Sequence, residues 1–98
     1  MIKITNEYVE YLKGNFFKCL CMFENKESNL TTFIDSLIYE VYGLRYVLEG
    51  KEDFLIILLS RLEHFYDDSK KENPDIKRIR REVFNSLNLI DKTLKVGD

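Results

Sequence analysis

The side chains best suited to chemistry are few in this chain of 98 residues, and they form no recognisable catalytic set. There is one histidine, His64, and there are two cysteines, Cys19 and Cys21. Residues two apart on a helix point about 160° away from each other, so these cysteines would share neither a disulfide nor a metal ion. A zinc site also needs further Cys or His ligands, which the sequence lacks. We therefore expect two reduced thiols, with no metal and no other cofactor.

His64 stands beside Glu63 and close to two aspartates, Asp67 and Asp68. Catalysis by this imidazole would need a nucleophile and a substrate pocket that converge on it, and no motif indicates either. The glycines, at positions 14, 43, 50 and 97, are too scattered to form a phosphate-binding loop. The carboxylates also lack the Glu-x-x-His spacing of di-iron bundles. We expect a protein that is not an enzyme.

Composition indicates one globular domain over residues 1–98. Apolar residues make up 45% of the chain and charged residues 33%, with a formal net charge of −2, which suits a single compact core. The longest apolar run, 54–59, is far shorter than the roughly 20 residues that cross a bilayer. The first residues lack the apolar stretch of a secretory signal. We expect a cytoplasmic protein with no membrane partner.

Apolar residues recur every three or four positions along four segments, which predicts four amphipathic helices. The scarcity of Gly and Pro favours long helices, and short connections make consecutive helices antiparallel. We therefore predict an all-α fold, a compact antiparallel bundle of about four helices. The third helix opens with 54–59, which is apolar all round, so we expect it to be central and surrounded by the others.

Capping residues predict where these helices begin and end. The first helix is expected after Thr5 or Asn6 and before a polar break over 24–29, and the second from Ser28 or Asn29 to Gly50. The third is expected from about Glu52 to Ser69. The fourth is expected to have Asn73 as its cap and Pro74 in its first position, to continue to Leu94 and to stop near Gly97.

Opposite its predicted core, the second helix carries an unusual line of aromatic and acidic residues. We refer to it as the tyrosine stripe, which consists of Asp35, Tyr39, Tyr42, Tyr46 and Glu49. These residues fall within about 80° of arc on a helix. Tyrosine is enriched where proteins meet each other. The stripe therefore either binds another protein or is covered by a neighbouring helix, and both alternatives stay open. The third helix has a related face, made of Glu52, Ile56, Ser60, Glu63 and Asp67.

Charges at the junction of the third and fourth helices oppose the helix dipoles. The third helix ends with two acidic residues, Asp67 and Asp68. The fourth begins with four basic residues, Lys77, Arg78, Arg80 and Arg81. A short loop would bring the two clusters together, so they either pair with each other or one is held for a charged partner. The outer face of the fourth helix is also basic, with Lys77, Arg81, Asn85, Asn88, Lys92 and Lys95. Because the chain as a whole is acidic, we do not expect this face to bind nucleic acid.

The size, the helical pattern and two segments resemble small bacterial immunity proteins of contact-dependent inhibition and bacteriocin systems. The segments are 54–63 (FLIILLSRLE) and 80–92 (RREVFNSLNLIDK), both in the second half of the chain. The resemblance implies a cytoplasmic protein that binds one cognate toxin domain and blocks it.

Together with the acidic and aromatic surface, this resemblance favours a basic toxin domain as the partner. The residues expected to contact it are Asp35, Tyr39, Tyr42, Tyr46, Glu49, Glu63, Asp67 and Asp68. Two alternatives stay open. One is a small regulator or assembly factor of a phage or mobile element, homodimeric through the tyrosine stripe. The other is a nucleic-acid-binding module that uses the fourth helix.

Overall fold

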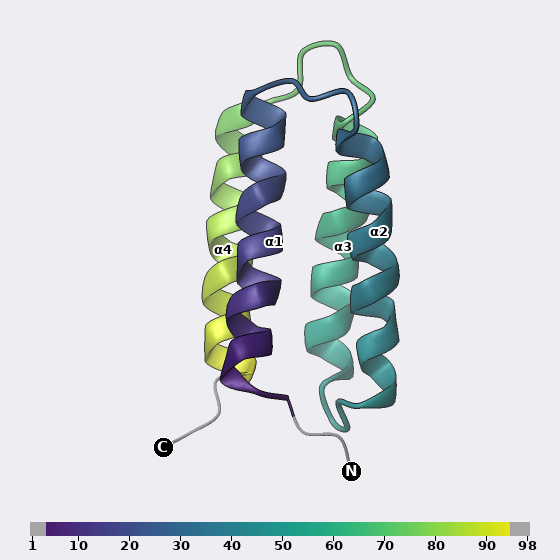
Figure 1. The fold of residues 1–98 in the computed structure, drawn as a ribbon, viewed down its shortest axis with the longest axis vertical. Helices are drawn as coiled ribbons and strands as arrows, with labels where there is room; N and C mark the ends of the chain where they lie inside the picture. Colours follow the sequence, from purple (N-terminus) through teal and green to yellow (C-terminus); the bar gives the residue numbers. More distant parts are fainter. Residues whose placement is uncertain (1–3, 95–98) are drawn as a thin grey trace.

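Four helices make up most of the computed structural model, which describes residues 4–94. They are α1 (Asn6–Glu24), α2 (Leu30–Gly43), α3 (Glu52–Asp68) and α4 (Ile76–Leu94), and a short 3-10 helix, η1 (Leu44–Tyr46), extends α2. Each helix runs antiparallel to the one before it (Figure 1). The predicted all-α antiparallel bundle is confirmed.

The helices pack as two antiparallel pairs, α1 with α4 and α2 with α3, and these pairs face each other (Figure 1). The core lies between them and is built from the apolar stripe of every helix. The fully buried Leu12, Phe16, Leu58 and Phe65 belong to it. Phe65 on α3 also meets Phe23 on α1 edge to face, with ring centroids 6.3 Å apart. Residues three and four apart on each helix therefore supply one continuous core, as the periodicity predicts.

The N-terminus of α1 is capped as the sequence predicts. The Oγ1 atom of Thr5 accepts a hydrogen bond from the backbone N–H of Tyr8 at 3.0 Å. This bond satisfies one of the first N–H groups of the helix, which have no partner within the helix itself.

The predicted end of the second helix is wrong. The α-helix ends at Gly43, and η1 follows it in place of a further α-helical turn up to Gly50. The backbone N–H groups of Val47 and Leu48 both donate to the carbonyl of Leu44 at 3.0 Å. The winding tightens directly after Gly43, a poor helix former, and Leu44 remains buried. Gly50 does adopt a left-handed conformation, with φ of 75°, in the loop before α3.

The predicted start of the fourth helix is two residues too early. Helix α4 begins at Ile76, and Asp75 caps it in place of Asn73, because its Oδ1 atom accepts the backbone N–H of Arg78 at 3.2 Å. Asp and Asn are about equally good N-caps, so the sequence Asn-Pro-Asp offers two possible starts. Pro74 consequently lies in the loop. The predicted stop at Gly97 lies outside the described residues.

The expectation that α3 is surrounded by the other helices is also wrong. Ile56 is 63% exposed and Ile57 is exposed as well, although Phe54, Leu55 and Leu58 are buried. Each helix of a four-helix bundle occupies a corner, so it turns one side to its neighbours and another to solvent. The apolar opening of α3 therefore leaves part of its hydrophobic surface uncovered.

Two adjacent phenylalanines on α1 test which side of this helix holds the bundle together. Phe16→Ala removes a fully buried ring and should lower the free energy of unfolding by about 3–5 kcal/mol. Phe17→Ala is the matched control, because Phe17 is about half exposed, and it should cost clearly less, about 1 kcal/mol. Urea denaturation followed by circular dichroism measures both. Equal losses would contradict this assignment of the core.

Candidate protein-binding face

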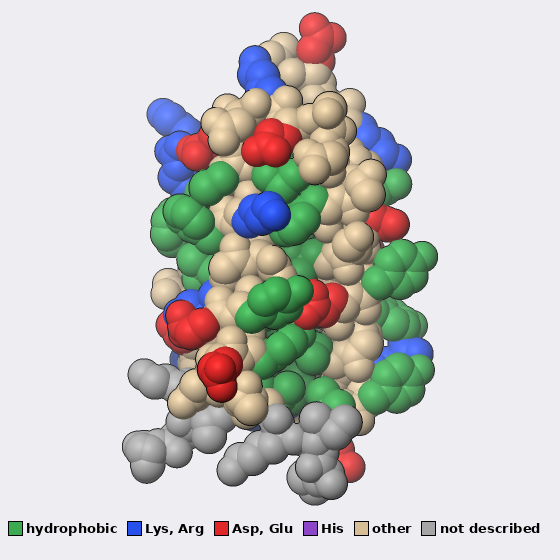
Figure 2. All heavy atoms as spheres, in the orientation of Figure 1, with side chains coloured by type: hydrophobic (Ala, Val, Ile, Leu, Met, Phe, Trp, Pro, Cys, Tyr) green, Lys and Arg blue, Asp and Glu red, His purple; other side chains and the backbone are tan. Residues whose placement is uncertain are grey.

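The tyrosine stripe lies on the outer surface of α2 and η1. Tyr39 is 72% exposed, Tyr42 51% and Tyr46 75%, and Asp35 and Glu49 are exposed too. Figure 2 shows hydrophobic side chains standing out at the right-hand edge of the molecule, over α2. No helix among the described residues covers the stripe, so the alternative in which its tyrosines belong to the core is wrong.

Acidic residues of two helices meet in one groove beside the stripe. Asp35 on α2 and Glu63 and Asp67 on α3 line a shallow cavity of about 310 Å³, with Ile38 and Tyr66 between them. We refer to Asp35, Glu63 and Asp67 as the acidic groove. All three are exposed. Residues that belong to two separate helices thus lie together in the fold and form one negatively charged groove.

Hydrophobic side chains continue this surface along the bundle. Residues seven apart on a helix share a face and lie about 10 Å apart, after nearly two turns. Tyr42 follows Asp35 by seven residues on α2, and Ile56 precedes Glu63 by seven on α3. Because α2 and α3 are antiparallel, both steps lead in the same direction, and both side chains are exposed. One end of the face is therefore acidic, and the next stretch is apolar.

Arg45 is a residue of this face that sequence reasoning missed. Its guanidinium carbon lies 3.9 Å from the centre of the Tyr42 ring and 4.6 Å from that of Tyr46. Its Nη2 atom also donates a hydrogen bond to the Tyr46 hydroxyl. The negatively polarised face of an aromatic ring attracts a cation such as the guanidinium group. Two tyrosines thus hold a positive charge on the stripe, before the exposed Glu49 at its far end.

The 3-10 turn explains why a projection of the sequence onto an α-helix does not place Arg45 on the tyrosine stripe. An α-helix would rotate this residue about 80° away from Asp35, off the stripe. Each residue of a 3-10 helix advances by about 120°, more than in an α-helix, and this brings Arg45 round toward Tyr42, three residues before it. The sequence could have predicted this contact, because Tyr42 and Arg45 are three residues apart and such pairs are neighbours on a helix.

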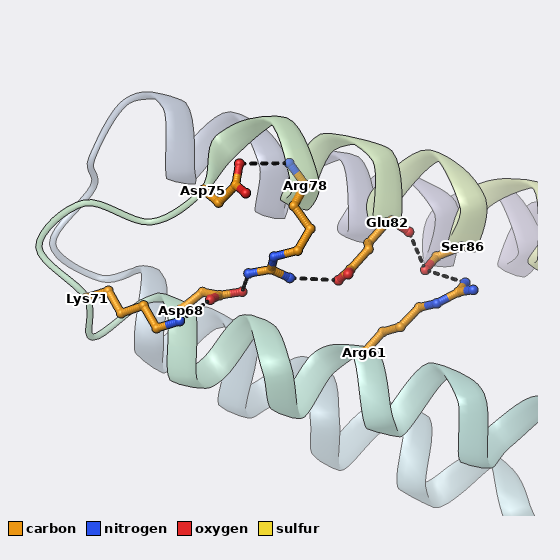
Figure 3. A network of polar contacts seen from close by, with 7 residues as sticks. All are labelled: Arg61, Asp68, Lys71, Asp75, Arg78, Glu82 and Ser86. Carbon is orange, nitrogen blue, oxygen red and sulfur yellow. Dashed lines mark hydrogen bonds and ion pairs between the residues drawn. The ribbon is translucent and has the colours of Figure 1, made fainter.

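Asp68 does not belong to the exposed face, so its assignment as a partner-binding residue is wrong. Its side chain is only 3% exposed and lies on the side of α3 that faces α4. One carboxylate oxygen contacts Nη2 of Arg78 at 2.6 Å, and the other contacts Nζ of Lys71 at 3.2 Å. Both oxygens therefore have partners within the chain (Figure 3). Asp67, the preceding residue, is exposed and stays on the face.

The predicted pairing between the acidic end of α3 and the basic start of α4 is confirmed for Asp68 and Arg78. Arg78 also contacts Glu82 on its own helix at 3.1 Å. Hydrogen bonds to Asp68 and Glu82 raise the pKa of the Arg78 guanidinium above its usual value. Arg80 points elsewhere and pairs with Glu24 of α1. Two of the four basic residues at the start of α4 are thus held in ion pairs within the chain.

These contacts continue as a polar seam between α3 and α4 (Figure 3). We use this name for Asp68, Arg78, Glu82, Arg61 and Ser86. Nη1 of Arg61 donates to the buried Ser86 hydroxyl at 3.1 Å, and this hydroxyl donates to the carbonyl of Glu82 at 2.8 Å. No buried side-chain nitrogen or oxygen lacks a hydrogen-bond partner in residues 4–94. Directional bonds of this kind position α4 against α3.

The outer face of α4 is exposed at Lys77, Arg81, Asn85, Asn88 and Lys92, and Lys95 lies outside the described residues. His64 is also exposed, near the polar seam. In the described part of the chain, no three His, Cys, Asp or Glu residues gather as metal ligands would. None of the helices between residues 4 and 94 is both long and apolar enough to span a membrane.

The chain was compared with protein-family models, with curated proteins and with solved structures, and none of them matches it. The resemblance to small immunity proteins stays a prediction from the sequence.

The buried pair of Asp68 and Arg78 predicts a strong effect on stability. Arg78→Ala leaves the Asp68 carboxylate buried without its main partner and should lower the free energy of unfolding by about 3 kcal/mol. Arg80→Ala is the matched control, since it breaks a more exposed ion pair with Glu24 and should cost about 1 kcal/mol or less. Urea denaturation measures both, and equal losses would contradict the structural role of the seam.

The two cysteines should differ in reactivity. Cys19 is fully buried, and burial raises the pKa of its thiol to about 12, whereas Cys21 is partly exposed. The thiolate is the reactive form, so iodoacetamide should modify Cys21 in the folded protein and leave Cys19 unmodified. Peptide mass spectrometry identifies the modified residue, and both should react in urea. Modification of Cys19 first would contradict the packing of α1.

Proposed function

We propose that this protein is a cytoplasmic binding protein whose α2–α3 face docks onto a basic toxin domain and blocks it, as immunity proteins do. The observation that carries the proposal is the exposure of Tyr39, Tyr42 and Tyr46 on one side of the bundle, with no helix of the described chain over them. A cluster of large exposed hydrophobic side chains is typical of an interaction site.

Tyrosine suits this task physically. Its ring offers a large apolar area with few rotatable bonds, and its hydroxyl can form a hydrogen bond at the edge of a contact. The tyrosines stand on regular helical turns, which hold them in place before binding. A rigid face loses little conformational entropy when a partner docks, so more of the contact energy becomes affinity.

The charge of the face favours a basic partner. The acidic groove places three carboxylates of two helices around one cavity. Lys or Arg side chains of a partner would complement it, and opposite charges would also accelerate association. Nuclease domains bind phosphate through basic clefts, so a protein that fills such a cleft with carboxylates and tyrosines would exclude the nucleic acid.

The outer face of α4 provides weaker support for the nucleic-acid alternative. Lys77, Arg81 and Lys92 are exposed there, but Arg78 and Arg80 are held in ion pairs within the chain. Phosphate contacts need several available cations, and the net charge of −2 opposes binding to a polyanion.

Single substitutions on the face test the proposal. Tyr39→Ala and Tyr42→Ala should each weaken the complex at least about tenfold, because they remove central aromatic contacts without touching the core. Asp67→Lys should slow association, with a difference that shrinks at high salt. Calorimetry and stopped-flow kinetics measure these effects, with the products of the two flanking genes as probes.

Phe84→Ala is the matched control, because Phe84 is an exposed aromatic residue of α4, outside the proposed face. It should leave the affinity unchanged, and circular dichroism should show all variants folded. The proposal fails if neither flanking gene product binds. It also fails if a complex forms that tolerates the changes to both tyrosines.

A further inference from the structure

The guanidinium group of Arg45 lies against two aromatic rings that belong to different elements. Tyr42 is part of α2, and Tyr46 is the last residue of η1. The guanidinium carbon lies 3.9 Å from the centre of the Tyr42 ring and 4.6 Å from that of Tyr46, and Nη2 donates a hydrogen bond to the Tyr46 hydroxyl. One side chain therefore connects the two rings across the change of winding after Gly43.

Arg45 makes these contacts although carboxylates are close to it along the chain. Glu49 follows it by four residues, a spacing at which opposite charges pair on a regular helix. Glu52 and Asp53 are exposed at the same end of the bundle (Figure 1). None of the ion pairs within residues 4–94 includes Arg45. The surface around it is therefore not positive as a whole, and its guanidinium group is engaged by the rings in place of an acid.

Both rings need such support because they are exposed. Within residues 4–94, neither ring stacks on another aromatic ring. An exposed side chain exchanges between rotamers, and its immobilisation on binding costs conformational entropy. A planar guanidinium group that stacks on both rings and holds the hydroxyl of Tyr46 restricts this exchange before a partner arrives.

We propose that Arg45 is a positioning residue, which holds the rings of Tyr42 and Tyr46 in one fixed arrangement on which a partner docks. The inference rests on the proposed function, which gives the two tyrosines a partner to bind. Arg45 acts through the rings and not through a contact between its own charge and the partner. Lysine cannot replace it, because an ammonium group lacks the planar surface that stacks on aromatic rings.

A measurement on the protein alone tests the arrangement of the rings. NMR relaxation of tyrosines labelled with ¹³C in the ring should show Tyr42 and Tyr46 more ordered in the wild type than in Arg45→Gln or Arg45→Lys. Tyr39 is the internal control, because the ring contacts of Arg45 are with Tyr42 and Tyr46, and its order should not change. If Arg45→Gln leaves the order of both rings unchanged, the inference is overturned.

Calorimetry with the products of the two flanking genes tests the consequence for binding. Arg45→Gln and Arg45→Lys should each raise the dissociation constant about fivefold. In a Tyr42→Leu/Tyr46→Leu background, which keeps apolar area without the rings, Arg45→Gln should cause no further loss. Arg81→Gln is the matched control, because it makes the same substitution at an exposed position of α4 and should leave the affinity unchanged.

Two binding results would overturn the positioning role and leave the proposed function intact. One is a loss on Arg45→Gln that persists in the Tyr42→Leu/Tyr46→Leu background, since Arg45 would then contact the partner directly. The other is full affinity in Arg45→Lys, which keeps the charge without the planar group. If neither flanking gene product binds, the proposed function fails, and the order of the two rings still decides whether Arg45 positions them.

Discussion

A carboxylate buried inside a small bundle is costly unless a cation lies against it, and Arg78 lies against Asp68 at 2.6 Å. The pair joins the end of α3 to the first turn of α4 across the loop between them (Figure 3). Because Glu82 and Ser86 continue the contacts along α4, the rotation of this helix is determined as well. Its basic outer side then points to solvent, and its apolar side meets α1.

Most of the fold could be predicted from the sequence, because the spacing of apolar residues determines which side of each helix enters the core. The errors concern choices between close alternatives. Asn73 and Asp75 are both good N-caps, and the cap that the chain uses depends on contacts made after folding. The end of α2 at Gly43 is missed because the apolar spacing of Val41, Leu44 and Leu48 continues past it, as it would in a longer helix. The first residues of α3 are apolar on every side of the helix, so their pattern does not indicate which side is exposed to solvent.

The candidate face was predictable in composition and not in arrangement. The tyrosines stand out on a helical projection because aromatic residues at that spacing are unusual opposite a core. The meeting of Asp35 with Glu63 and Asp67 requires the packing of two helices, so it is a tertiary property. Asp68 differs from Asp67 only by one position along the helix, yet this rotation of about 100° carries it from solvent into the seam.

The α2–α3 face belongs to a single helical hairpin, contiguous in sequence from Asp35 to Asp67. The other pair, α1 with α4, joins segments from opposite ends of the chain and supplies the rest of the core. In the proposed function, recognition uses the outer side of this hairpin, while its inner side and the α1–α4 pair form the core. Substitutions on the exposed side of the hairpin can alter specificity during evolution while the α1–α4 pair stays constant, and a new partner can be acquired without redesign of the core.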